Sequence, residues 1–241
     1  MIKVDSLLYK IDQKLNKLST NEHQQIPLED KILALNEAQI QLIKQKVDGS
    51  QSGLGMDAFK KRYEDLQGLI EDYHDHGLSL TQVNKKLNEW SASITNLTPQ
   101  YLFYVDSYIL ADKDRCKDRI IWINRDLTKH GDVQFLINNE YYKPSFEYQE
   151  TFNTISSDKI SVYTDGTFTP SKLYLMYLRQ PKYINKEGYV DLNGDDSTTV
   201  DCELPSHLED ELVNLAVKHL AEYTENISAV QSAAERIITG E

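Results

Sequence analysis

The spacing of apolar residues changes twice along this chain of 241 residues. Near both ends, apolar residues recur every three or four positions, which is the spacing of one face of an α-helix. Between Pro99 and Pro181, aromatic and β-branched residues are frequent, which is typical of β-strands. The sequence therefore predicts an α+β fold in three parts, residues 1–98, 99–190 and 191–241.

Residues 1–98 are predicted to form an antiparallel helical bundle. Residues 4–18 and 28–47 carry helical spacing, and in the second segment apolar side chains cover about half of the helix circumference. We therefore expect neighbours on two sides of that helix. Further helices are predicted over residues 59–73 and 79–94, and Ser79 with Gln82 fits a capping box at the start of the last one. Helices joined by short connections form such bundles.

Residues 99–190 are predicted to form an antiparallel β region. The runs 101–108 and 120–123 are rich in aromatic and β-branched residues. Asp165-Gly166 separates the β-prone runs 159–164 and 167–169, and this dipeptide favours a hairpin turn because the turn requires positive φ. Residues 172–179 are apolar on both faces, so we expect a central strand that is covered on both sides.

The last part, residues 191–241, reads as an acidic loop followed by helices that pack on the bundle. Ser206 and Glu209 fit a second capping box, and an apolar stripe runs from Leu208 to Tyr223. A final amphipathic segment adds apolar surface after a helix that already carries its own stripe. We predict that it docks onto another subunit or a partner through Ile227, Val230, Ala234, Ile237 and Ile238, with folding back into the core of the chain as the alternative.

The composition narrows the class of protein. The formal net charge is −12, which disfavours non-specific clamping of nucleic acid, since that requires clustered Lys and Arg. The beginning of the chain does not read as an export signal, and no apolar run has the length of a membrane span, so we expect a soluble, intracellular chain. The two cysteines, Cys116 and Cys202, are far apart in sequence, and we expect free thiols, with a disulfide as the alternative.

Two sequence motifs contain residue types that bind metals. His74 and His76 are only two residues apart, whereas zinc ligands on a helix favour a separation of one turn. The stretch 191–196 begins like a calcium loop, but Asp196 and Cys202 stand where an EF-hand requires Gly and Glu. We therefore predict no metal site and no cofactor, with weak calcium binding at the acidic loop as the alternative.

Motifs for nucleophilic, phosphate-binding and zinc-dependent catalysis are missing from the sequence, namely Gly-x-Ser-x-Gly, a Gly-rich loop ending in Lys-Ser/Thr, and His-Glu-x-x-His. Carboxylate pairs are common in an acidic chain, so no single pair indicates acid–base catalysis. We expect a structural protein with no catalytic residues rather than an enzyme. Most of the 15 tyrosines fall between Tyr101 and Tyr189, where they suit an interface and a strand core equally well.

Three stretches resemble virion proteins of tailed bacteriophages, in particular the head–tail connector or ring proteins of crAss-like and related short-tailed phages. They are Ala34-Leu35-Asn36-Glu37-Ala38-Gln39-Ile40-Gln41-Leu42-Ile43-Lys44, Leu175-Met176-Tyr177-Leu178-Arg179-Gln180-Pro181 and Leu204-Pro205-Ser206-His207-Leu208-Glu209-Asp210-Glu211-Leu212-Val213-Asn214-Leu215-Ala216-Val217. Their order spans most of the chain.

This resemblance implies a cyclic homo-oligomer, often a dodecamer, that is stacked below the portal protein and neighbouring ring or tail proteins. DNA would pass through it as cargo, and a net negative lumen would repel the phosphate backbone. The chain would be assembled in the bacterial cytoplasm and would reside in the virion, with no membrane partner. The alternative is a tail-associated module whose tyrosine-rich β region recognises a host glycan or host surface.

Overall fold

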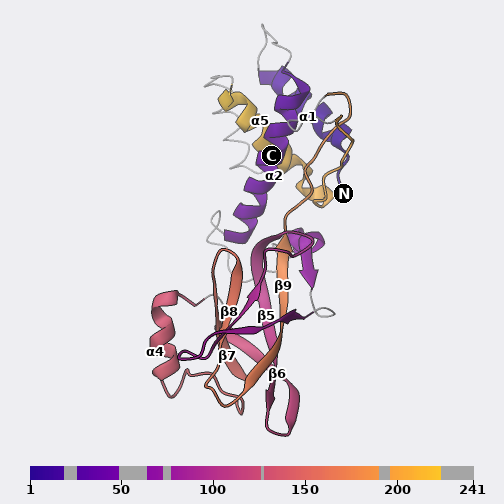
Figure 1. Ribbon diagram of the computed structural model, residues 1–241. Helices are drawn as coiled ribbons and strands as arrows, with labels where there is room; N and C mark the ends of the chain where they lie inside the picture. Colours follow the sequence, from indigo (N-terminus) through magenta and orange to yellow (C-terminus); the bar gives the residue numbers. More distant parts are fainter. Residues whose placement is uncertain (19–25, 49–63, 73–76, 126–127, 190–195, 224–241) are drawn as a thin grey trace. The chain divides into compact units, whose positions relative to one another are not determined.

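The chain has an α+β fold and divides into two compact units (Figure 1). The structure is a computed structural model, and it describes residues 1–18, 26–48, 64–72, 77–125, 128–189 and 196–223. The helical unit comprises residues 1–69 and 181–241, and the β unit comprises residues 70–180. The β unit is therefore inserted between two parts of the helical unit, and the units divide at other residues than the predicted 98 and 190.

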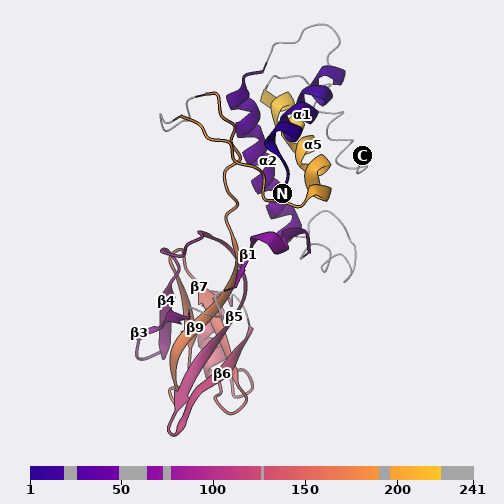
Figure 2. The ribbon, with the colours of Figure 1, turned by 90° about the vertical axis from the view of Figure 1, so that its right-hand side faces the viewer.

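Three helices form the centre of the helical unit: α1 (Val4–Leu18), α2 (Leu28–Asp48) and α5 (Glu209–Tyr223) (Figure 2). Their positions confirm the three helices predicted from periodicity, and α5 packs against both α1 and α2. Side chains on a wide arc of α2 are buried, as the half-apolar circumference predicted. They are Ile32, Ala34, Leu35, Asn36, Ala38, Gln39, Leu42 and Ile43.

Hydrogen bonds join the two parts of the helical unit. Ile2 and Cys202 form an isolated antiparallel bridge, with N–O distances of 2.9 and 3.0 Å. The Asp201 carboxylate then accepts the Val4 amide at 3.0 Å and so satisfies one of the amides at the start of α1. The predicted capping box at α5 is wrong, because the carboxylate of Glu209 accepts from the Ser6 hydroxyl at 2.6 Å.

A long connection, residues 181–205, leads from the β unit back to α5. Asn36 on α2 fixes it with two bonds to one residue: its Nδ2 donates to the Ile184 carbonyl at 2.9 Å, and its Oδ1 accepts the Ile184 amide at 2.8 Å. Farther along, Asn185 and Val200 form an antiparallel bridge. Through the two Asn36–Ile184 bonds, this connection is a second neighbour for α2 besides α5.

The described residues of the β unit form nine strands. They are β1 (Ile70–Asp72), β2 (Leu78–Ser79), β3 (Thr81–Asn84), β4 (Glu89–Ser93), β5 (Tyr101–Lys113), β6 (Cys116–Arg125), β7 (Glu150–Ile155), β8 (Lys159–Tyr163) and β9 (Thr169–Arg179). Their order in the sheet is β1-β9-β5-β6-β7-β8-β4-β3, and β2 also pairs with β9. All pairs are antiparallel except β6 with β7.

The sheet curls around one hydrophobic core. Strands that are distant in the sheet order, such as β4 and β9, contribute side chains to the same buried cluster. That cluster contains Ala92, Ile109, Ala111, Ile121, Ile123, Phe146, Ile160, Val162, Phe168, Leu173, Leu175 and Tyr177, among others. Since side chains alternate along a strand, the neighbouring residues of these strands point to the outside of the unit.

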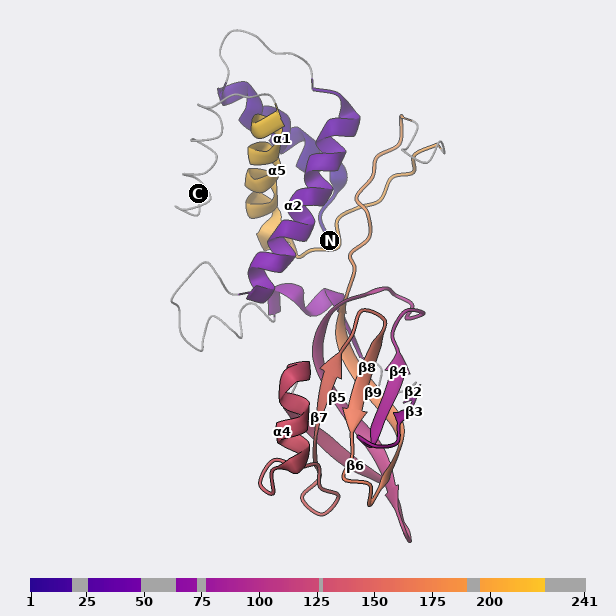
Figure 3. The same ribbon diagram turned by 60° about the vertical axis from the view of Figure 1, so that its left-hand side comes forward.

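The outer face of β7 and β8 carries a short helix, α4 (Val133–Asn138), which follows the 3-10 turn His130–Asp132 (Figure 3). Val133 and Leu136 of this helix are buried against Phe152 of β7 and Tyr163 of β8. The rings of Phe152 and Tyr163 stack with centroids 4.9 Å apart. The helix is thus held by a small apolar cluster of its own.

Two of the predicted helices are not present as expected. Residues 79–94 form strands β2 to β4 in place of the fourth helix of the bundle, so Ser79 and Gln82 do not cap a helix. Of the expected helix over residues 59–73, the described part is helical only at 64–66, passes through the 3-10 turn Gln67–Leu69, and then enters β1.

The predicted hairpin around Asp165-Gly166 is also wrong. A turn does occur there, and Gly166 has a φ of +82°. However, β8 pairs with β4 and β7, whereas β9 pairs with β5, β1 and β2, so the turn joins two strands that do not pair with each other. The central position of β9 is confirmed, because it pairs with β5 on one edge and with β1 and β2 on the other. The expected cover of both faces is incomplete: Leu173, Leu175 and Tyr177 are buried, while Tyr174 and Met176 on the other face are half-buried.

Candidate functional site

The predicted docking residues Ile227, Val230, Ala234, Ile237 and Ile238 lie outside the described residues. The same holds for His74 and His76, and for most of the acidic loop at 191–196. Within the part of the chain that the structure describes, no three His, Cys, Asp or Glu side chains gather as a metal site would require. No described helix has the length and apolar character needed to cross a membrane.

Exposed aromatic side chains gather in one segment of the β unit, α4 and the loop after it. Phe135 is 62% exposed and Tyr141 is 88% exposed, and Tyr142 and Tyr148 are also exposed. Large aromatic side chains are costly to leave in water and are enriched at interfaces and ligand sites. We refer to Phe135, Tyr141, Tyr142 and Tyr148 together as the α4 aromatic group.

The orientation of Phe135 follows from helix geometry. Val133 and Leu136 point toward β7 and β8, and this fixes which face of α4 is turned outward. Gln134, Phe135 and Asn138 lie on that outward face and are exposed. A six-residue helix that buries one face in its own cluster therefore presents a ring and two amides to solvent.

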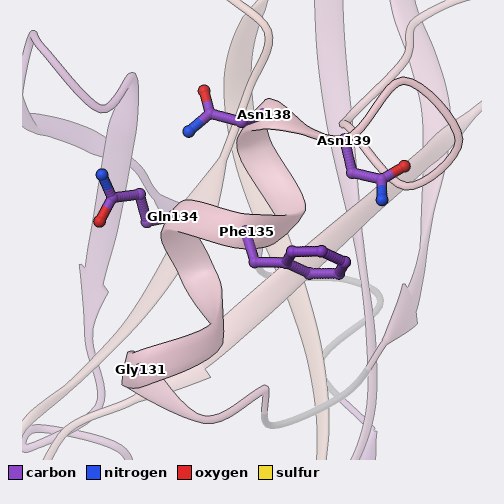
Figure 4. A pocket seen from close by; sticks show the side chains of 5 residues that line it. All are labelled: Gly131, Gln134, Phe135, Asn138 and Asn139. Carbon is purple, nitrogen blue, oxygen red and sulfur yellow. The ribbon is translucent and has the colours of Figure 1, made fainter.

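A shallow hollow lies on this face, lined by Gly131, Gln134, Phe135, Asn138 and Asn139 (Figure 4). The side chains around it are one aromatic ring and three primary amides, and none of them is charged. Figure 4 shows the amides of Gln134 and Asn138 on one side of the helix, with the Phe135 ring and the Asn139 amide on the other. Among the described residues, none forms a hydrogen bond with the side chain of Gln134 or Asn138.

The loop after α4 is fixed at both of its ends. Asn139 Oδ1 accepts the Tyr141 amide at 2.9 Å, and the Asn139 carbonyl accepts the Lys143 amide at 2.9 Å. Farther on, Ser145 and Glu150 exchange two backbone bonds of 2.8 and 3.0 Å, and Phe146 enters the core of the β unit. The exposed tyrosines therefore project from an ordered backbone, which lowers the entropy lost when a partner binds.

An ion pair supports the same loop from the β5–β6 turn. Lys113 Nζ donates to Glu147 Oε1 at 2.7 Å, and this bond lowers the pKa of the Glu147 carboxyl and raises the pKa of the Lys113 ammonium. The guanidinium of Arg119 lies 4.9 Å from the centre of the Phe146 ring, a cation–π contact. Both groups are at the surface, so we assign them a positioning role with a small energetic contribution.

A second exposed apolar surface lies on the outer face of β9, β5 and β6. Tyr108 stands between Tyr174, with centroids 4.9 Å apart, and Trp122, with centroids 5.6 Å apart. Trp122 is 50% exposed, and Ile120 beside it on β6 is also exposed. We refer to Tyr108, Ile120, Trp122 and Tyr174 as the outer-sheet group. This group lies over β9, β5 and β6, whereas α4 covers β7 and β8, so the two surfaces lie over different strands of the sheet.

The tyrosines thus divide between core and surface. Tyr163 and Tyr177 are buried, whereas Tyr141, Tyr142 and Tyr148 are exposed. The sequence indicated an interface and a core as equal alternatives, and the structure shows core positions for some tyrosines and exposed positions for others. Neither α4 nor its hollow was predicted, although Val133, Leu136 and Ile137 carry the spacing of one helical face, and Phe135 falls outside that face.

A scan against protein-family models finds no match, and a comparison with curated protein sequences finds none either.

Proposed function

We propose that this chain is a structural virion protein, which forms a ring in the head–tail connector or tail of a bacteriophage. The ring would join the portal to the tail and conduct DNA. The three stretches that resemble connector proteins lie in α2, in β9 with the residues after it, and in α5 with the residues before it. Each of them therefore includes part of a main element of its unit. This proposal assigns no catalytic residue.

The observation that carries the proposal is the pair of exposed apolar surfaces on the β unit. A closed ring of identical subunits uses two different surfaces, one on each side, that meet at every joint. The α4 aromatic group and the outer-sheet group are two different surfaces of this kind, and they lie over different strands of one unit. A neighbour on each side would remove both from water.

The distribution of charge supports the DNA-conducting role. Residues 1–69 and 181–241 carry 23 Asp and Glu against 14 Lys and Arg, whereas residues 70–180 carry 15 against 12. The excess negative charge therefore belongs mainly to the helical unit. If that unit lines the channel, repeated copies would repel the phosphate backbone and keep DNA from adhering.

The test is the mass of the assembled particle. We expect the chain, produced together with the portal protein of its phage, to co-purify as a ring whose native mass is a whole multiple of 27.8 kDa in addition to the portal. Trp122→Ser should reduce ring formation, because it removes the largest side chain of the outer-sheet group. Tyr9→Ser, at an exposed aromatic residue of α1, is the matched control. A chain that stays monomeric with the portal present would contradict the proposal.

A second candidate function is supported by a separate observation. The high exposure of the α4 aromatic group on an ordered loop is also what a recognition surface requires. The chain would then be a tail-associated module that binds a host glycan or host surface. Such a module would bind host polysaccharide as a monomer or trimer, whereas a connector would assemble with portal.

A further inference from the structure

We propose that the hollow beside α4 binds a neutral saccharide through the Phe135 ring and the amides around it. The inference deepens the second candidate function by giving it a site and a ligand class. It is an alternative to the ring joint proposed above, because a neighbouring subunit packed on the α4 aromatic group would cover the hollow.

The chemistry of the lining selects the ligand class. Sugar hydroxyls both donate and accept hydrogen bonds, and a primary amide offers both functions in one side chain. Gln134 and Asn138 are free for this among the described residues, and Asn139 has only its Oδ1 engaged, by the Tyr141 amide. A pyranose ring also has an apolar face of C–H groups, for which the exposed Phe135 ring provides an apolar contact.

The same lining disfavours charged ligands. None of the five lining residues carries a charge, so the hollow has no cation to pair with a phosphate, sulfate or carboxylate. The exposed charges next to it in sequence have both signs, with Asp132 and Glu140 against Lys129 and Lys143, so they create no strong local field. An uncharged polar ligand with an apolar face is the class that remains.

The backbone around the hollow supports binding without rearrangement. Val133 and Leu136 fix α4 on β7 and β8, and the Asn139 bonds fix the start of the following loop. Tyr141, two residues after Asn139 in sequence, is nearly fully exposed. The hollow is shallow and open, so a single copy should bind with millimolar affinity, and several copies in one particle would raise the overall affinity.

The experiment is saturation-transfer NMR on the full chain with four neutral hexasaccharides: cello-, malto-, manno- and chitohexaose. We expect at least one to bind at millimolar concentration. Phe135→Ala should weaken that binding about tenfold, because the ring contact is lost. Phe135→Trp keeps a ring and should retain binding, and Asn138→Leu should weaken it about threefold or more.

Tyr9→Ala is the matched control, because Tyr9 is 64% exposed, close to the 62% of Phe135, and does not line the hollow. Its binding should equal that of the parent, and circular dichroism should show that every variant folds. If none of the four saccharides binds the parent, the inference is wrong. That result does not bear on ring assembly with the portal, which is tested separately by the mass of the particle. If Phe135→Ala binds as well as the parent, the saccharide site lies elsewhere and only the glycan-recognition function stands.

Discussion

Gln39 lies near the middle of the buried arc of α2, and its side chain is only 1% exposed. Among the described residues, none accepts a hydrogen bond from its Nε2. Leu35 and Ile43, one helical turn before and after it, are fully buried. Asn36, the other buried amide of this helix, uses both ends of its side chain to hold Ile184. The Asn36 amide therefore stabilises the helical unit, whereas the Gln39 amide has a donor without a hydrogen-bond acceptor among the described residues.

We predict that Gln39→Met stabilises the protein. Methionine has a similar shape and no polar donor, so the free energy of unfolding should rise by about 1–2 kcal/mol. The matched control is Gln41→Met on the same helix, because Gln41 Oε1 is paired with His219 Nε2 at 2.7 Å. In Gln41→Met the free energy of unfolding should fall by about 0.5–1.5 kcal/mol, because this hydrogen bond is lost. Urea unfolding followed by circular dichroism measures both, and a shift of the same sign in the two variants would contradict the assignment.

The two cysteines differ in their environment. Cys116 is exposed at the start of β6, and Cys202 is buried beside Ile2; both are free thiols. Burial raises the pKa of the Cys202 thiol to about 11. The expectation of free thiols is confirmed, and only one of them is available to reagents.

We predict that Ellman's reagent at pH 8 modifies one thiol per native chain quickly. The reactive species is the thiolate, and at this pH a buried group with a raised pKa is almost fully protonated. Cys116→Ser should therefore remove the fast reaction, and denaturant should make both thiols of the parent react. Rapid modification of native Cys116→Ser would show that Cys202 is accessible.

The three long helices could be predicted from sequence, because each repeats an apolar face over several turns. The strands in residues 79–94 could not be predicted from the sequence, because the apolar residues there are spaced as on a helix. They are Leu80, Val83, Leu87, Trp90 and Ile94. In the structure Leu80 and Ile94 are buried, but Val83 and Leu87 are exposed. Strand β4 is set by pairing with β8, some seventy residues later, as in the pair Trp90 with Val162. Such long-range pairing outweighs local periodicity and is not visible in one sequence.

The Asp165-Gly166 turn is a second case in which the local sequence does not determine which strands pair. The positive φ of Gly166 was predictable from the dipeptide, but the partners of β8 and β9 were not. The helix α4 was missed because six residues are too few for a clear periodic signal. The predicted docking segment with Ile227 and Ile238 lies outside the described residues, so that prediction stands as made.

We predict that Gly166→Ala destabilises the β unit by about 1–2 kcal/mol, the approximate cost of placing an L-residue in the left-handed region. The new Cβ would also lie 2.9 Å from Asn88 Nδ2, although that side-chain end has room to adjust. Gly68→Ala is the control, since nothing lies within 4 Å of the added carbon and its φ is not positive. It should be neutral or slightly stabilising. Thermal melts in which the melting temperature falls equally in the two variants would argue against strain at Gly166.

At the scale of the whole molecule, the β unit is an insertion in the helical unit. Residues 1–69 and 181–241 form one compact unit although 111 residues separate them in sequence. The chain enters the β unit through β1 and leaves it through β9, and these strands are antiparallel partners, with Ile70 opposite Leu178. Entry and exit are therefore adjacent, and the insertion can be removed without stretching the helical unit.

Each unit also has its own buried core: the sheet cluster in one, and the side chains between α1, α2 and α5 in the other.

We predict from this that the two units fold independently. Residues 70–180 alone should give a β-type circular dichroism spectrum and a cooperative melt. Residues 1–69 joined to 181–241 by a short Gly-Ser linker should give a helical spectrum with its own melt, because the Ile2–Cys202 bridge and the packing of α5 on α1 and α2 lie within that unit. The linker needs about four residues, since paired antiparallel positions lie roughly 5 Å apart. The control is the same linked helical chain carrying Leu212→Asp, which places a charge at a fully buried position of α5 and should prevent folding. If the linked helical chain behaves like this control while the full protein is folded, the helical unit depends on the β unit and the division into independent units is wrong.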